Sequence, residues 1–123
     1  MKLATRLSML LLLVSVLAVG AIAQRAPVAA QDEGLTFVFV THDLGAGIFA
    51  PVRRGMEDAC EMVGATCEFI GPQTYDVAEQ VALLEATVAR APDGIATTRP
   101  EPGAYDGVIQ AAKDAGIKVV TFN

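Results

Sequence analysis

Apolar and polar residues follow two different patterns along the chain from Leu35 to Asn123. Four short runs are mostly apolar and rich in β-branched or aromatic residues, a pattern typical of strands buried on both faces. Between these runs, apolar residues recur at intervals of three and four, which predicts amphipathic helices. The predicted strands cover residues 35–40, 66–70, 95–98 and 117–122, and the predicted helices cover residues 51–63, the stretch between Asp76 and Ala91, and residues 104–115.

Each predicted helix has one apolar face and recognisable ends. Asp76 and Glu79 form a variant of the capping box, in which side chains satisfy the first free amides of a helix. Gly64 and Gly116 follow the first and third helices, at the position where glycine commonly ends a helix. We expect the inward faces to consist of Val52, Met56, Ala59, Cys60 and Val63, then Val77, Val81, Leu84 and Val88, and finally Val108, Ile109 and Ala112.

The order of the elements, β-α-β-α-β-α-β, predicts an α/β fold with a three-layer open parallel sheet and right-handed crossovers. A parallel strand is normally covered on both faces. Here three helices accompany four strands, and the fourth strand runs almost to the last residue, Asn123. We therefore expect residues 35–123 to be a partial lobe, the first part of a longer protein.

Residues 1–30 have the three parts of a secretory signal peptide. The 11-residue apolar run of residues 9–19 follows two basic residues and precedes small ones. It is shorter than the about 20 residues that a transmembrane helix needs. Cleavage after Ala23 or Ala30 predicts an exported product, in the periplasm or outside the cell, with a flexible leader at residues 31–34. An uncleaved membrane anchor is the alternative.

The composition narrows the choice of partners. The product that begins at Gln31 has six basic and fourteen acidic residues, a net charge of −8. Nucleic-acid binding requires clustered Lys and Arg, so this charge argues against it. One histidine and two cysteines do not make a zinc site, and we expect no metal or cofactor. In an exported protein, Cys60 and Cys67 form either a disulfide or two buried thiols.

In an open parallel sheet, ligands bind beyond the carboxyl ends of the strands. The loops expected there are Thr41–Ala50, Gly71–Tyr75 and Thr98–Gly103, together with Asn123. The first loop contains the spacing G-x-G-x-x-A, which nominally fits a dinucleotide fingerprint. Four residues separate these glycines from the strand, and Pro51 would break a helix begun at the second glycine. The loop is therefore not expected to bind a dinucleotide.

The same loop has features suited to a small polar ligand. Aromatic and apolar side chains can pack against a sugar ring while polar groups bind its hydroxyls. Phe49 and Ile48 fit the first role, and His42 and Asp43 fit the second. Each also has a purely structural interpretation. The two apolar residues can be a staple onto the helix, His42 a solvated loop residue and Asp43 a turn former.

Residues 35–123 resemble the type 1 periplasmic substrate-binding proteins of ABC sugar importers, the ribose-binding-protein group. The resemblance rests on the joint order of an aromatic residue before the first helix, "DVAEQV" opening the second, "PDGIA" before the third strand, and "DAGIKVVTFN". The segments "LGAGIF" and "GPQTYDVAEQV" are most similar to the branch that binds rhamnose and autoinducer-2. That branch has a basic residue where His42 stands and an acidic one near Asn123, so its ligand is not carried over.

The resemblance implies two α/β lobes that close on a small carbohydrate or related polar ligand, and a closed form that docks on an ABC permease. It implies that His42, Asp43 and Asn123 hydrogen-bond ligand oxygens, that Phe49 stacks on the ligand, and that Ile48 forms an apolar wall. Arg99 is a further candidate, with a solvated loop charge as its alternative. The mature protein is expected to have no membrane-spanning segment.

Three other functions compete with transport. The same fold can present its ligand to a receptor or kinase as a sensor. A hydrolase is disfavoured because Ser8 and Ser15, the only serines, lie in the predicted signal peptide, and Cys60 lies on a buried stripe. We therefore expect no catalytic residues and no enzyme activity. A repressor's sensor core is disfavoured by the signal peptide.

Overall fold

The computed structural model describes residues 34–123, so the predicted signal peptide and residues 31–33 of the predicted leader lie outside the described residues. Strands and helices alternate strictly over this range. In chain order they are β1 (Thr36–Val40), α2 (Phe49–Val63), β2 (Thr66–Ile70), α3 (Val77–Arg90), β3 (Gly94–Thr97), α4 (Pro102–Asp114) and β4 (Lys118–Thr121). The predicted order is confirmed, with boundaries that differ by at most two residues.

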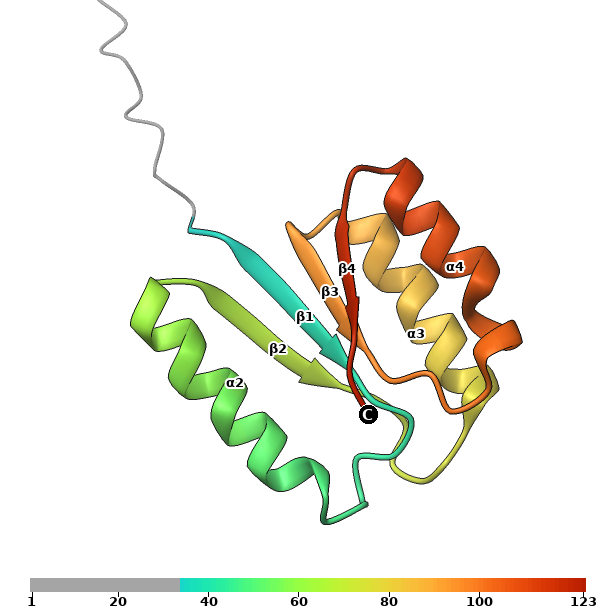
Figure 1. The fold of residues 1–123 in the computed structure, drawn as a ribbon, viewed down its shortest axis with the longest axis horizontal. Helices are drawn as coiled ribbons and strands as arrows, with labels where there is room; N and C mark the ends of the chain where they lie inside the picture. The colour runs from blue at the N-terminus through green and yellow to red at the C-terminus, as the bar shows by residue number, and fades with distance from the viewer. Residues whose placement is uncertain (1–33) are drawn as a thin grey trace, which may run out of the picture. The chain divides into compact units, whose positions relative to one another are not determined.

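The four strands form one parallel sheet in the order β2-β1-β3-β4. Helix α2 covers one face, while α3 and α4 lie together on the other (Figure 1). Strand β2 pairs with one side of β1, and β3, which comes later in the chain, pairs with the other side. The direction of winding therefore reverses between β1 and β3, and the carboxyl ends of these two strands flank the topological switch point.

The main core lies between the central strands and the helix pair α3 and α4. Val38 and Val40 of β1 and Ile95 beside them in β3 are at most 3% exposed. They contact a group of fully or nearly buried residues from the two helices: Leu84, Tyr105, Val108 and Ala112. This packing holds β1 and β3, and with them the loops that follow, in a fixed relation.

The helix ends follow the predicted chemistry with one difference. The Asp76 carboxylate accepts a hydrogen bond from the Glu79 backbone N–H at 2.9 Å, as expected of an N-cap. The reciprocal bond of a capping box is replaced, because the Asp76 N–H donates to the His42 carbonyl at 3.2 Å. Gly64 ends α2 with a φ of 67°, a conformation that glycine adopts without strain.

The predicted inward face of α2 is partly wrong. Met56 and Cys60 are buried, but Ala59 and Val63 are exposed, since α2 packs mainly over β2. They border an apolar groove of about 320 Å³ over β1, β3 and β4. On α3, Val77, Val81 and Val88 are only half-buried, whereas Gln80 and Thr87, which the apolar pattern did not identify, are fully buried.

Cys60 near the end of α2 and Cys67 in β2 are joined in a disulfide, with their Cα atoms 6.3 Å apart. Gly64 reverses the chain between them, so that strand β2 returns beneath the helix that precedes it. The bond closes a short loop and ties α2 to the edge strand of the sheet.

Candidate functional site

The segments that follow the four strands meet at one edge of the sheet, near the C-terminal residue (Figure 1). The loop after β1 continues to pair with the loop after β2 beyond the strands themselves. The Leu44 N–H donates to the Pro72 carbonyl at 2.8 Å, and the Gly45 N–H donates to the Gln73 carbonyl at 3.2 Å. These bonds place His42 and its neighbours on a held loop, which suits a site that needs defined geometry.

His42 lies where three of these segments converge. Its Nδ1 is 2.9 Å from the Thr98 hydroxyl at the end of β3. Its ring meets Phe49 and Tyr75 edge-on, with 5.3 Å between ring centroids in both cases. The ring is half-buried, and its Nε2 is neither hydrogen-bonded nor sealed from solvent within residues 34–123. His42 therefore presents one free ring nitrogen at this edge.

The two apolar candidates differ sharply in exposure. Phe49 is 2% exposed and packs against Phe69 and Phe122 as well as His42. Its ring supports His42 from within, and little of the residue is exposed. Ile48, which directly precedes Phe49, is 62% exposed. The stacking role of Phe49 and the wall role of Ile48 remain predictions.

Asp43 organises its own loop. One of its carboxylate oxygens accepts hydrogen bonds from the Gly45 N–H at 2.9 Å and the Ala46 N–H at 3.1 Å. This is the local turn chemistry that aspartate favours. Asp43 is half-buried, and a ligand-binding role for it remains a prediction.

Arg99 and Asn123 lie at the same edge in different surroundings. One Nη of Arg99 donates to the Asp106 carboxylate at 2.7 Å and to the Pro102 carbonyl at 2.8 Å. Its charge is therefore engaged by the first turns of α4. Asn123 is exposed and follows Phe122, whose N–H donates to the Thr97 carbonyl. Ligand contacts by both remain predictions.

Tyr75 and Glu101 belong to this edge and were not singled out from the sequence. Tyr75 is 53% exposed, and its hydroxyl donates to a Glu101 carboxylate oxygen at 3.2 Å. Partial desolvation and the neighbouring Glu101 carboxylate raise the pKa of the Tyr75 phenol. The signal was available, since Tyr75 ends one of the loops expected at the strand ends.

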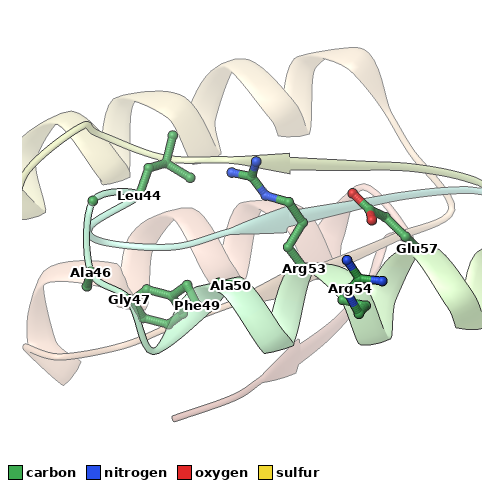
Figure 2. A pocket seen from close by; sticks show the side chains of 9 residues that line it. Leu44, Ala46, Gly47, Phe49, Ala50, Arg53, Arg54 and Glu57 are labelled. Atoms are coloured by element: carbon green, nitrogen blue, oxygen red, sulfur yellow. The ribbon is translucent and has the colours of Figure 1, made fainter.

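A separate hollow of about 360 Å³ lies beside the loop after β1 and the first turns of α2 (Figure 2). It does not include His42 or Tyr75. It is lined by Leu44, Gly45, Ala46, Gly47, Phe49, Ala50, Arg53, Arg54 and Glu57. The Arg53 guanidinium, one of its charged groups, lies over the Phe69 ring, 5.2 Å from the ring centroid.

The first two amides of α2 are already engaged by the loop before it. The Phe49 N–H donates to the Ala46 carbonyl at 3.1 Å, and the Ala50 N–H donates to the Gly47 carbonyl at 3.3 Å. Pro51, the next residue, has no amide hydrogen. A phosphate at a helix N-terminus depends on such donors. Their engagement supports the expectation that the G-x-G spacing is not a nucleotide site.

Two further observations concern residues 34–123 as a whole. They contain no group of three or more His, Cys, Asp or Glu side chains arranged to hold a metal ion. The helices α2, α3 and α4 all fall short of the length and apolar character that crossing a membrane requires.

Comparison with protein families gives one decisive match. The model of the periplasmic binding protein domain covers residues 37–123, nearly all of the described structure. The chain belongs to the periplasmic binding protein family. The predicted fold class, a parallel α/β sheet like that of type 1 sugar-binding proteins, is confirmed by this match and by the solved structures described next.

Several known proteins are about a third identical to this chain over the residues that align. The xylose/arabinose-binding protein XylF of Sulfolobus acidocaldarius is 33% identical over 86 residues, 70% of this chain and 21% of that protein. The arabinose-binding protein AraP of Geobacillus stearothermophilus is 38% identical with a TM-score of 0.69, over 73% of this chain and 31% of that one. A XylFII–LytSN complex contains a chain that is 30% identical with a TM-score of 0.69, over 72% of this chain and 32% of that one.

These matches cover less than a third of each relative's length, so the chain corresponds to one part of a larger architecture. The likeness to the rhamnose and autoinducer-2 branch remains a prediction.

Proposed function

We propose that this chain is part of an exported binding protein that captures a sugar-sized polar ligand for an ABC-type importer. The proposal rests on one combination of observations. A chain of the periplasmic binding protein family carries a half-buried His42, with one open ring nitrogen, at the carboxyl edge of its sheet. Relatives named for binding xylose and arabinose make a pentose the first ligand to test.

The exposed groups around His42 suit a polar ring. Tyr75 and Ile48 are more than half exposed and provide apolar area. The His42 Nε2 and the Glu101 carboxylate provide hydrogen-bonding groups beside it. Sugars are held by this mixture of apolar faces and directed hydrogen bonds. We therefore propose His42 as the central polar contact, with Asp43, Asn123 and Arg99 as further candidates.

The proposed action is binding coupled to closure, without a chemical step. In proteins that close on a ligand, two rigid bodies move together about a hinge, and the ligand stabilises the closed form. Residues 34–123 would supply the contacts on one side of the ligand. The opposing contacts would come from the part of the longer protein that this chain does not span.

The test is a titration of the full-length protein with D-xylose, L-arabinose, ribose, rhamnose and glucose, followed by calorimetry and thermal shift. A ligand at 100 times its Kd stabilises the protein by about 2.7 kcal/mol. Replacing His42 with Ala removes the hydrogen bond proposed to the ligand, which is expected to weaken binding about tenfold. Glu85→Ala, on the exposed side of α3, is the matched control and should bind normally. Absence of binding across the panel would overturn the proposal.

A second candidate is a sensor that presents its bound sugar to a membrane receptor. It is favoured by the similarity to a chain of the XylFII–LytSN complex. The two functions separate in cells that lack the gene. Loss of labelled-sugar uptake indicates transport, whereas normal uptake with a lost transcriptional response to the sugar indicates sensing.

A further inference from the structure

A buried polar network connects His42 to the interior behind the sheet. It consists of Tyr105, Gln80, Thr97, Thr98 and His42, and we call it the Gln80 network. The first four of these residues are fully buried, although they carry polar side chains. Such groups are costly to bury unless each donor and acceptor has a partner. The pairing inside the network therefore determines where its hydrogens lie.

The orientation of the Gln80 amide is fixed by its neighbours. Its Nε2 lies 3.0 Å from the Thr98 carbonyl and 3.4 Å from the Val40 carbonyl, and carbonyl oxygens only accept hydrogen bonds. The nitrogen must therefore face them. Its Oε1 faces the opposite way and accepts a hydrogen bond from the Tyr105 hydroxyl.

The direction of the next bond follows from this orientation. Gln80 Nε2 also lies 3.1 Å from the hydroxyl oxygens of Thr97 and Thr98, so its two hydrogens are shared among these oxygens and the two carbonyls. An amide nitrogen accepts no hydrogen bond, and the Thr98 hydroxyl hydrogen therefore points away from it. The hydroxyl of Thr98 keeps one hydrogen of its own. Within residues 34–123, His42 Nδ1 at 2.9 Å is the acceptor within reach of that hydrogen. If Nδ1 carried a hydrogen instead, the buried Thr98 hydroxyl would be left without an acceptor, which is unfavourable.

We propose that Thr98, oriented by Gln80, selects the tautomer of the neutral His42 ring that has its hydrogen on Nε2. The ring nitrogen that reaches solvent is then a hydrogen-bond donor, and Thr98 and Gln80 are positioning residues for it. The tautomer of a histidine is set by the hydrogen bond that its other nitrogen makes. The edge of the sheet therefore presents an N–H group at a defined place.

This assignment has a consequence for the ligand, which rests on the proposed function. An N–H donor selects a ligand with an accepting oxygen at the matching position, such as a hydroxyl or a ring oxygen. A deoxy analogue that lacks this oxygen leaves the donor unpaired, and sites built on such bonds discriminate strongly against it. His42 would then select among ligands by the position of its N–H group, which the hydrogen bond with Thr98 determines.

His42 is the one histidine of residues 1–123, and in the full-length protein its signals are those that His42→Gln removes. The protein is labelled with ¹⁵N-histidine, and long-range nitrogen–carbon-proton correlations are recorded without ligand at a pH where an imidazole is ordinarily neutral, about 8.5. His42→Gln confirms the assignment by losing the signals. The expected spectrum has a protonated Nε2 and an unprotonated Nδ1. A protonated Nδ1 would overturn the proposal.

Two variants of Thr98 separate positioning from general structure. Thr98→Val removes the hydroxyl and is expected to give a mixture of both tautomers, whereas Thr98→Ser keeps the hydroxyl and the wild-type spectrum. Thermal unfolding of both variants checks that they are folded. A wild-type tautomer ratio in folded Thr98→Val would overturn the role of Thr98.

Binding gives a second readout once a sugar is identified. Thr98→Val should weaken its affinity about tenfold, with rescue by Thr98→Ser. The spectra need no ligand, so a failed sugar panel would overturn the proposed function and leave the tautomer assignment standing.

Discussion

The Tyr105 hydroxyl on α4 donates a hydrogen bond to Gln80 Oε1 on α3, and both side chains are fully buried. The two residues are 25 positions apart, and their bond joins the two helices behind the sheet. It is also the inner end of the network that reaches His42. This one contact therefore links the packing of α3 and α4 to the geometry of the candidate site.

Removing the Tyr105 hydroxyl should cost stability out of proportion to its size. Tyr105→Phe leaves the Gln80 carbonyl oxygen buried without a donor, which costs about 1–3 kcal/mol of the free energy of unfolding. Tyr75→Phe is the matched control, since its hydroxyl lies on an exposed side chain and should cost less than about 0.5 kcal/mol. Urea unfolding measures both. Equal losses in the two variants would contradict the role assigned to the buried bond.

Tyr105 also makes stability depend on alkaline pH. Burial, with the nearby Tyr75 and Glu101, raises the pKa of the Tyr105 phenol to about 12, whereas the unfolded value is 10.0. Between these values the unfolded chain releases the proton and the folded chain keeps it. The free energy of unfolding should therefore fall as pH rises from 10 to 12, by up to about 1.4 kcal/mol per pH unit.

Below pH 10 this contribution is fully present, and titration of Tyr105 should not change the free energy of unfolding with pH. Urea unfolding at several pH values gives the slope. Tyr105→Phe should show a smaller fall above pH 10 than the wild type, and an unchanged slope would mean that the phenol is not held in its neutral form.

The Cys60–Cys67 disulfide should stabilise the fold by restricting the unfolded chain. Closing a loop of this length, with a sequence separation of 7, contributes about 2–3 kcal/mol in the chain-entropy model. Adding a reductant should lower the urea midpoint of the wild type accordingly. A variant with both cysteines replaced by serine should start at the lower midpoint and ignore the reductant. A midpoint of the wild type that does not move would mean that the bond is absent or without effect.

Gly71 should tolerate no side chain, because it lies against the loop that carries His42. A Cβ at this position would lie 2.5 Å from the Thr41 carbonyl oxygen and 2.8 Å from the Thr41 Cγ2. The backbone after β1 would have to move, so Gly71→Ala should destabilise the protein by about 1–3 kcal/mol.

Gly107 in α4 is the control for this variant, because a Cβ there meets nothing within 4 Å. Gly107→Ala should stabilise the helix by up to about 1 kcal/mol. The two variants should thus move the thermal midpoint in opposite directions. A neutral Gly71→Ala would show that the loop after β1 is free to shift.

Most of the architecture was predictable from local patterns. The continuous apolar runs located all four strands, and 66–70 matched β2 at both ends. Helices α2 and α4 begin two residues earlier than predicted, at Phe49 and Pro102. Proline is accepted in the first turn of a helix. It therefore indicates the region where a helix starts but does not determine which residue is the first.

The candidate site was predictable only in its location. The rule that ligands bind beyond the strand ends identified the loops that contain His42, Asp43 and Tyr75. It could not say that Phe49 is buried beneath His42, because the contacts of Phe49 with Phe69 and Phe122 join residues far apart in the chain. The turn of Asp43 was one of the interpretations that the sequence offered, since its partners Gly45 and Ala46 are its neighbours in the chain.

The sequence by itself determined the strand and helix order, the helix caps and the edge of the sheet where a ligand would bind, because periodicity and turn chemistry act over a few neighbouring residues. Only the tertiary structure decided that Gln80 contacts the buried Thr98, and that Thr98 in turn contacts His42. Their positions lie 38 and 56 residues beyond it in the chain, and the parallel sheet with its crossover helices brings them together. The chemistry that the site offers thus depends on hydrogen bonds between distant segments, which the fold creates.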